Sequence, residues 1–338
     1  MGAADITPRV VVLYNDPVND EEPSEVGVLG EVEDVVTAVQ SLGRSVESVS
    51  ISRETLAPVL ASLEARREDT LVFNLCEGLN GQPKHEPLLA GLLEFHGIRF
   101  TGNASTTLSW ALNKQVASAI LRFSGVNTPE SRVFRAAPDP AEVEGISFPV
   151  IVKPVREDGS LGITADAVVR TAPELRARVG WVLETYQQPA LVERYLPGRE
   201  FNLSVIGEGA DACVLPVEEI VFKGYRPGEP RLLSHDAKWN TGSHDDVRTI
   251  PTCPALVDEE LRTALASLAL SAYGTFECRG YARIDTRLDT KGTPFVIDVN
   301  PNPDISRVAG LALAAKHAGF SYEEFVNTIM EAAWKRPL

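Results

Sequence analysis

The sequence lacks the patterns that mark several classes of protein. Only four of its 338 residues are cysteines, none of them in a CxxC pair, and its five histidines form no triad or zinc-ligand set. The N-terminus has no apolar signal core, and no stretch reaches the roughly 18 consecutive apolar residues of a membrane span. These absences predict a cytoplasmic protein with reduced thiols and no membrane partner.

Positive charge is also scarce, because 32 Lys and Arg residues stand against 47 Asp and Glu residues, for a net charge of -15. A nucleic-acid-binding surface normally needs a basic stripe, so the composition argues against a nucleic-acid partner. Any anionic ligand must therefore be held by a few local lysines and arginines inside a negative overall field.

Two common nucleotide-binding motifs are missing as well. No GxGxxG follows the first predicted strand, which removes the main support for a nicotinamide-dependent oxidoreductase. The string GxxxxGK[ST] of a phosphate-binding P-loop is absent too.

Predicted strands and helices alternate in the N-terminal part of the chain. Continuous apolar runs indicate strands at 9–14, 46–51, 71–75 and 97–101, and helical spacing indicates helices at 31–42, 55–66 and 88–96. Residues 15–30 are polar and rich in turn formers, so they are expected to form a loop. The alternation predicts a parallel α/β domain that binds ligands at the carboxyl ends of its strands.

The rest of the chain has a different pattern. One long helix is predicted at 103–125, because apolar residues recur at helical spacing before a terminating glycine. Strands are expected at 148–153, 165–169, 190–193, 201–206, 280–288 and 294–300, and helices at 173–186, 258–273 and 309–334. The polar stretch 223–246 is predicted to be a long loop, and loops of this length are usually functional or disordered.

The predicted C-terminal hairpin carries the most specific pattern, GYARIDTRLDTKGTPFVIDVNPNP. A turn near Lys291 puts Asp285 opposite Asp298, and Asn300 shares the face of Asp298 because residues two apart point the same way. Three such oxygen ligands suit Mg²⁺ shared with phosphate oxygens. Arg283 lies on the same face and is a candidate to stabilise an anionic intermediate. The alternatives are a solvated hairpin face and an ordinary salt bridge.

Two further segments carry candidate binding residues. In SFPVIVKPVREDGSLGIT a buried strand ends in Lys153 before a glycine-containing loop, a combination that can hold phosphate. In ALVERYLPGREF, Glu193 and Glu200 bracket a turn and can accept hydrogen bonds from a ribose or an amine. Lys238 lies in the long polar loop. The alternatives are an ordinary hairpin loop, charged rim residues and a solvated lysine.

Taken together, the segments resemble the D-alanine–D-alanine ligase branch of the ATP-grasp superfamily. From about residue 71 to 334, FNLCEG, GIRFTG, FPVIVKP, VERYLPGREF, LPVEEI, AKW, GYARID and DVNPNP follow the order of that family's motifs. The resemblance implies an ATP-grasp fold of mixed α/β and α+β class. It implies an N-terminal Rossmann-like α/β domain at 1–102, a central ATP-grasp subdomain at 103–190, and a C-terminal ATP-grasp subdomain with the magnesium and substrate site at 191–338.

The resemblance also implies residues that bind ATP. Lys114 and Lys153 would contact its phosphates, and Ser160 lies in the loop that would cover them. The adenine and ribose would be held by Glu193, Leu196 and Glu200.

The remaining implied roles concern the metal and the chemistry. One or two Mg²⁺ ions, with Mn²⁺ as an alternative, would be held by Asp285, Asp298 and Asn300. Arg283 would steady the oxyanion, and Lys238 belongs to the loop that closes over the site. The resemblance also suggests a homodimer.

Several positions depart from the family pattern. Asp298 is shorter than the usual glutamate, Gly159 replaces a serine of the phosphate loop, and Trp239 replaces a tyrosine. Asp304 replaces a glycine, and Ala309 stands where the family has a serine that grips the carboxylate of the second substrate. The N-terminal loop also lacks the family's Glu-Arg string. The ATP half of the site is therefore better preserved than the amino-acid half, and Asp304 points to a cationic acceptor.

We therefore expect an ATP-dependent carboxylate–amine ligase that acts on small molecules through an acyl phosphate and forms a dipeptide or related amide with ADP and phosphate. The alternatives are a D-alanine–D-alanine ligase proper, a non-catalytic ATP-binding protein, and an ATP-grasp enzyme that uses a thiol or hydroxyl nucleophile. The lysines and metal ligands argue against the non-catalytic alternative.

Overall fold

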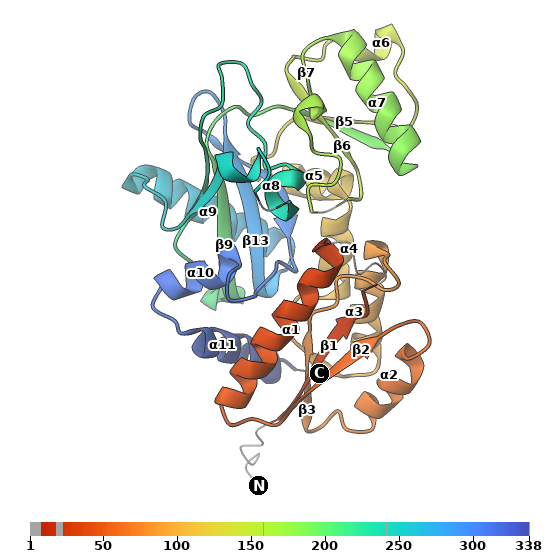
Figure 1. Cartoon of the computed structure of the whole chain (residues 1–338), viewed down its shortest axis with the longest axis vertical. Coiled ribbons are helices and arrows are strands. Elements are labelled where there is room, and N and C mark those ends of the chain that lie inside the picture. Colours follow the sequence, from red (N-terminus) through yellow and green to blue (C-terminus); the bar gives the residue numbers. More distant parts are fainter. Residues whose placement is uncertain (1–7, 18–22, 158, 241, 338) are drawn as a thin grey trace.

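The computed structural model describes residues 8–17, 23–157, 159–240 and 242–337. Within these residues the strands form three sheets. Figure 1 shows the N-terminal sheet in one lobe, the central sheet in a second, and the C-terminal sheet beside both. The combination of a parallel sheet with two antiparallel sheets is the expected mixed α/β and α+β class.

The N-terminal sheet is parallel and has the strand order β2-β1-β3-β4. Its strands are β1 (Arg9–Asn15), β2 (Val46–Ile51), β3 (Thr70–Asn74) and β4 (Arg99–Phe100). The helices that cover it are α1 (Pro23–Ser41), α2 (Leu56–Glu64), α3 (Glu86–Phe95) and α11 (Tyr322–Lys335). Val10 packs with α1 and α11, whereas Val11 packs with α2 and α3 on the opposite face. Both faces are buried, which explains the continuous apolar run of β1.

Helix α1 starts earlier than the sequence predicted. It begins at Pro23, so the loop expected at 15–30 is wrong over its C-terminal part, while residues 18–22 lie outside the described residues. Proline is favoured in a first helical turn. The buried Val28 continues the stripe formed by Val32 and Val35, and this apolar face outweighs the glycines that suggested a loop.

The long helix predicted at 103–125 is two helices, α4 (Ser105–Leu112) and α5 (Lys114–Phe123). They are separated by Asn113, which has an extended backbone and accepts hydrogen bonds from the amides of the next helix through its side chain. The predicted apolar stripe is therefore wrong at the end of α5, where Phe123 is 96% exposed and Leu121 is buried, although Ile120 still packs against the core.

The central sheet is antiparallel, in the order β5-β8-β6-β7, and helix α7 (Ala172–Tyr186) packs on one face. The strands are β5 (Ser131–Phe134), which the sequence analysis missed, β6 (Val150–Pro154), β7 (Val168–Val169) and β8 (Ala190–Arg194), with the short helix α6 (Pro140–Val143) nearby. Since β8 pairs with β5 and β6, we propose that the central domain extends to residue 194. The rest of the three-domain division stays a prediction.

The C-terminal sheet has the order β12-β11-β9-β13-β14, with β10 added on β9. Its strands are β9 (Glu200–Glu208), β10 (Cys213–Val214), β11 (Glu218–Phe222), β12 (Thr249–Thr252), β13 (Arg279–Leu288) and β14 (Pro294–Asn300). One face buries Phe201 and Ile284 against α9 (Glu259–Thr275). The expected hairpin is confirmed as β13 and β14.

The remaining helices position the ends of the C-terminal sheet. They are α8 (His235–Trp239), inside the stretch predicted as a loop, and α10 (Gly310–His317), which precedes α11. Single 3-10 turns form at Pro83–His85, Ala165–Ala167, Gly209–Asp211 and Asp246–Arg248. None of the helices among the described residues has the length and apolar character needed to cross a membrane.

Candidate active site

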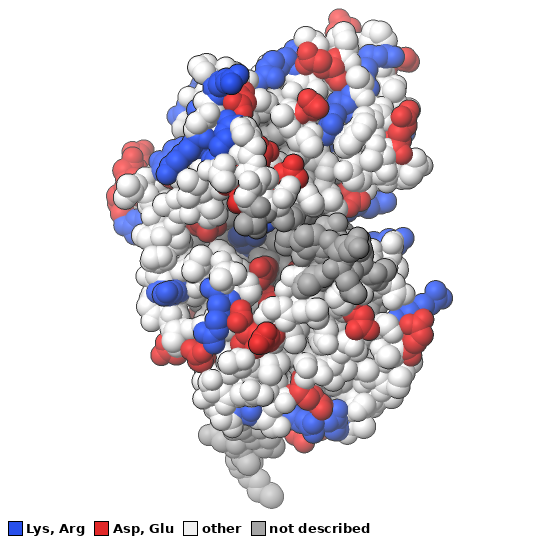
Figure 2. Space-filling view, viewed as in Figure 1, with Lys and Arg blue, Asp and Glu red and all other residues white. Residues whose placement is uncertain are grey.

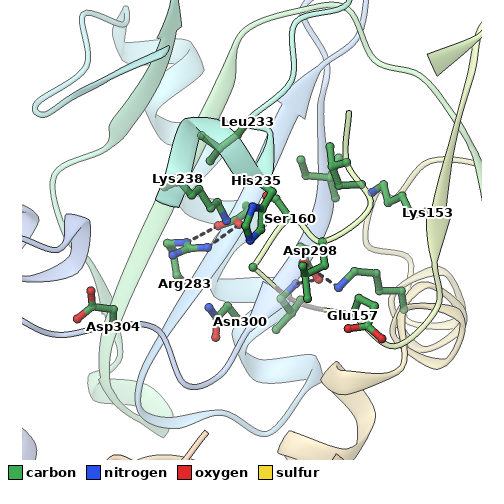
Figure 3. Close-up of a pocket in the computed structure, with 18 of the residues that line it drawn as sticks. Lys153, Glu157, Ser160, Leu233, His235, Lys238, Arg283, Asp298, Asn300 and Asp304 are labelled. Atoms are coloured by element: carbon green, nitrogen blue, oxygen red, sulfur yellow. Dashed lines mark hydrogen bonds and ion pairs between the residues drawn. The ribbon is translucent and has the colours of Figure 1, made fainter. Parts of the chain in front are cut away.

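A cleft of about 930 Å³ opens where the three sheets meet. Its walls include Glu77 from the N-terminal domain, Lys153 from the central sheet and Asp298 from the C-terminal sheet. Every residue to which the sequence analysis gave a binding or catalytic role lines this cleft, and Figure 3 shows many of them converging. The volume lies at the upper end of the range for small-molecule sites, which suits a ligand as large as a nucleotide.

A row of polar residues crosses the C-terminal sheet on the face toward the cleft. Glu218 on β11 pairs with Asn202 on β9, Asn202 pairs with Asp285 on β13, and Asp285 pairs with Asp298 on β14. Directly opposed residues on neighbouring strands point to the same face of a sheet. The predicted opposition of Asp285 and Asp298 is therefore confirmed, and the row is wider than the sequence analysis expected.

Two cations neutralise the carboxylates of this row. The Lys114 Nζ lies 3.2 Å from Asp298 Oδ2, and the Arg283 guanidinium donates to both oxygens of Asp285 at 2.6 and 2.9 Å. Burial alone would raise the pKa of Asp298, but Lys114 and Lys153 outweigh it, so the pKa lies below its usual value. Burial would likewise lower the pKa of Arg283, but Asp285 reverses this effect and raises it. Asp298 and Arg283 are therefore held in their ionised forms.

The oxygen ligands of the row fit a hard divalent cation. Asp285, Asp298 and Asn300 line the cleft with the carboxylate and amide oxygens that Mg²⁺ prefers. The neighbouring Asn202 has a buried Oδ1 that accepts no hydrogen bond within the described residues. In that part of the chain, no group of three or more His, Cys, Asp or Glu side chains is placed to hold a metal. Asp285, Asp298 and Asn300 are therefore the residues of the cleft whose chemistry fits such a cation.

The opposite end of the cleft is built by the central sheet and the start of β9. The Lys153 Nζ lies 2.7 Å from the buried Glu193 Oε2, and Leu196 is also buried against the cleft. Glu200 faces Arg287, with 3.5 Å between Oε2 and Nε. Burial raises the pKa of Glu200 although Arg287 opposes the shift. This end offers an apolar wall with carboxylates at its rim, which suits a base and a sugar.

Two segments extend over the cleft from either side. The loop after β6 turns through Gly159 and Ser160, which both have positive φ and both line the cleft. Asp158 lies outside the described residues. From the other side α8 places Lys238 above Arg283, as Figure 3 shows. The pKa of Lys238 is lowered, mainly because protein atoms surround its ammonium group and also because Arg283 is positive. The residue as a whole is still exposed to the solvent of the cleft.

The sequence analysis missed polar residues on the walls, above all Asn202, Glu218 and Arg287. Glu200 and Asn202 are two apart on β9, so strand alternation could have placed Asn202 beside the predicted Glu200. For Glu218 the only signal was its position in LPVEEI, where two adjacent glutamates must face opposite sides of a strand.

The outer surface carries mixed charge. On the face drawn in Figure 2, Lys and Arg side chains are interspersed with Asp and Glu side chains.

Comparison with known proteins identifies relatives along nearly the whole chain. The family model described as "D-ala D-ala ligase C-terminus" matches residues 112–331. An uncharacterized protein, y4sG, from Sinorhizobium fredii is 33% identical over 80% of this chain and 76% of its own length. The D-alanine–D-alanine ligase of Cupriavidus taiwanensis is 30% identical over 86% of this chain and 89% of its own length.

A solved structure agrees in fold. The D-alanine–D-alanine ligase of Bacillus anthracis complexed with ATP superimposes with a TM-score of 0.75 at 20% sequence identity, covering 97% of this chain and 98% of the other. The family's activity is ATP-dependent formation of a carbon–nitrogen bond between small molecules. The chain belongs to the D-alanine–D-alanine ligase family of ATP-grasp enzymes.

Proposed function

We propose that this ligase activates a carboxylate as an acyl phosphate and transfers the acyl group to an amine, giving an amide, ADP and phosphate. The observation that supports this proposal best is the pairing of Asp285 and Asp298 across the hairpin, with Lys114, Lys153 and Arg283 around them. Phosphoryl transfer depends mainly on positioning and on neutralising charge, and this arrangement supplies both.

In the first step a substrate carboxylate oxygen attacks the γ-phosphorus of ATP, and the bond to the bridging oxygen breaks to release ADP. Lys114 and Lys153 would hold the phosphates, and the loop with Ser160 would cover them. The adenosine would lie at the end of the cleft lined by Glu193, Leu196 and Glu200.

The metal site belongs to the same step. Asp285, Asp298 and Asn300 would hold Mg²⁺, which would neutralise charge on the phosphate oxygens. Asp285 is paired with Arg283 in this structure. If Asp285 bound Mg²⁺ instead of Arg283, the guanidinium of Arg283 would be free to contact a substrate.

In the second step the neutral amine attacks the acyl carbon, phosphate leaves as the carbon–oxygen bond breaks, and the nitrogen loses a proton. A negative charge forms on the carbonyl oxygen before phosphate leaves. Arg283 would stabilise this oxyanion, and Lys238 would add a second positive group from α8 above it.

The relatives named as D-alanine–D-alanine ligases make D-alanyl-D-alanine synthesis the second candidate. Asp304 and Ala309 line the cleft at positions where the sequence departs from the family pattern, which favours other substrates. The resemblance also suggests a homodimer, which sedimentation velocity would test.

The first experiment measures phosphate release from Mg-ATP by the purified protein. Pools of D- and L-amino acids and small carboxylic acids are supplied, and products are analysed by mass spectrometry. We expect phosphate release that requires two substrates, together with a new amide mass. Tight ATP binding without turnover in any pool would favour the non-catalytic alternative, and a chain that does not bind ATP would refute the proposal.

A further inference from the structure

Glu218, at one end of the polar row, has no role in the proposed reaction. Only 4% of its surface is exposed, and its Oε2 accepts a hydrogen bond from Asn202 Nδ2 at 2.8 Å. Within the described residues its Oε1 accepts none, although Glu218 lines the cleft. Beside it, Asn202 is 7% exposed and its buried Oδ1 has no partner in the same part of the chain. The Glu218 Oε1 is therefore the atom that a ligand in the cleft can contact, and a buried carboxylate gains from such a partner.

Glu218 also lies against the beginning of α10. A Cβ on Gly310, the first residue of that helix, would stand 2.8 Å from Oε2 and 2.9 Å from Oε1. The N-terminus of a helix attracts carboxylates, because its backbone amides and its dipole are positive. A substrate carboxylate drawn to these amides would therefore meet the Glu218 carboxylate, which already lies against Gly310.

The cations of the cleft compensate only in part for this negative charge, since four of them pair with other carboxylates and Arg283 opposes it only partly. Lys114 pairs with Asp298, and Arg283 pairs with Asp285. At the far end Lys153 pairs with Glu193 and Arg287 with Glu200. Asp304 adds an exposed carboxylate to the end of the cleft near α10.

We propose that Glu218 makes this end of the cleft a subsite for an amine acceptor that carries no carboxylate next to its amino group. The inference rests on the proposed ligase function. The Glu218 carboxylate attracts the ammonium form of the acceptor, and its free Oε1 accepts a hydrogen bond from the amino group. A carboxylate on the adjacent carbon would approach the buried Glu218, where like charges repel in surroundings of low dielectric.

The ionisation of Glu218 adds a dependence on pH. Burial raises the pKa of this carboxyl group, and the hydrogen bond from Asn202 and the charge of Arg283 only partly oppose the shift. The subsite is therefore active when pH exceeds this raised pKa. The KM for the acceptor should rise as pH falls through it, while the KM for ATP changes less.

The test compares two acceptors, isotopically labelled alanine and alaninamide, each as both enantiomers. They differ only in whether the carbon next to the amino group carries a carboxylate or a neutral amide. They are supplied with Mg-ATP and a pool of carboxylic acids, and labelled amides are measured by mass spectrometry. We expect kcat/KM for alaninamide to exceed that for alanine at least tenfold. The amino group of alaninamide is less basic, so more of it is neutral at a given pH and this alone raises the ratio. The ratio must therefore be compared between the wild-type protein and a variant.

Glu218→Gln supplies that comparison, because the amide keeps an oxygen for Asn202 but removes the charge. We expect the ratio of alaninamide to alanine to fall at least tenfold in this variant. The matched control is Glu219→Gln on the same strand. Glu219 does not line the cleft, and its carboxylate oxygens lie 2.7 Å from the guanidinium nitrogens of Arg199. The control should leave the ratio unchanged.

The outcomes separate this inference from the proposed function. The inference is overturned if the wild-type protein prefers alanine, or if the ratio of alaninamide to alanine is equal in wild type and Glu218→Gln. Either result leaves the proposed ligase function intact. If no acceptor of either kind forms an amide, the proposed function itself fails. If Glu218→Gln does not fold, a preference of the wild-type protein for alanine still overturns the inference, because the lower basicity of alaninamide works in the opposite direction.

Discussion

Replacing Asn103 with alanine should destabilise the protein, because this buried side chain joins the start of the central region to the hairpin of the active site. Its Nδ2 donates to the backbone oxygens of Tyr281 and Pro301 at 2.8 and 2.6 Å. Its Oδ1 accepts from the backbone amide of Arg279 at 2.7 Å. Thus one side chain holds the first half of β13 and the segment that follows Asn300.

The expected loss follows from these three bonds. Each hydrogen bond contributes about 1 kcal/mol net, and each buried backbone group left without a partner adds a desolvation penalty of about 1 kcal/mol or more. Asn103 is 3% exposed, so water does not readily replace the amide. We therefore expect Asn103→Ala to lower the free energy of unfolding by about 3–5 kcal/mol.

Urea denaturation followed by far-ultraviolet circular dichroism measures this loss. Asn127→Ala is the matched control, since its Nδ2 makes a 3.4 Å bond to the oxygen of Pro294 at an exposed site. The control should change stability by no more than about 0.5 kcal/mol. A loss below about 1 kcal/mol for Asn103→Ala would refute the reasoning, because the bonds would then be replaced or unnecessary.

Three further predictions follow from single contacts. Gly198→Ala should destabilise the protein by about 1–3 kcal/mol in urea denaturation, because a Cβ there would stand 2.4 Å from the oxygen of Leu288. Lys114→Ala should weaken ATP binding at least tenfold by calorimetry, because it removes a proposed phosphate ligand and leaves Asp298 without its cation. Glu218→Gln should make the protein more stable than wild type above the raised pKa of the glutamate. That gain should disappear below the unfolded pKa of about 4.3, where both proteins carry a neutral side chain.

The first two of these changes each have a control of the same chemistry. Gly274→Ala lies inside α9 with open space around its Cβ, so it should stabilise by up to about 1 kcal/mol, the opposite sign to Gly198→Ala. Lys335→Ala removes an exposed lysine paired within α11 and should leave ATP binding unchanged. Equal effects of variant and control would contradict the stated cause in each case.

The hairpin of the active site could be predicted because its order is local. Strand alternation and a short turn determine which residues oppose one another, and Asp285 does face Asp298. A register shift after Asp285 moves the pairing so that Thr286 faces Val296. This irregularity was not visible in the sequence, but it lies on the turn side of the aspartates and leaves their opposition intact.

The full width of the polar row could not be predicted, because it depends on pairing between distant strands. β11 reaches β9 only after β10 has intervened, so no local pattern tells which residue opposes Asn202. The pair Glu218 and Glu219 illustrates the difficulty: one carboxylate faces the cleft and the other pairs with Arg199. The alternation of side chains along a strand predicts that Glu218 and Glu219 lie on opposite faces of the sheet, but it does not predict which of the two faces the cleft.

The break at Asn113 was missed for a different reason. The apolar spacing continues through it, and an asparagine within a helix costs little in propensity. The break puts Lys114 in the first turn of α5, where its amide donates to the oxygen of Val155 and its Nζ reaches Asp298. Tertiary contacts of this kind override a helical pattern that is otherwise consistent.

The ion pairs of the cleft indicate that nucleotide and metal should bind cooperatively. Leaving one charge of a fully buried pair without its partner costs about 3–5 kcal/mol, and the cost is smaller for the partly exposed pair of Lys114 and Asp298. If the phosphates of ATP took Lys114 from Asp298, that carboxylate would face the phosphates without a cation. A divalent cation on Asp285 and Asp298 restores the balance and frees Arg283 at the same time. Each ligand therefore supplies the charge that the other removes, and the coupling must be reciprocal.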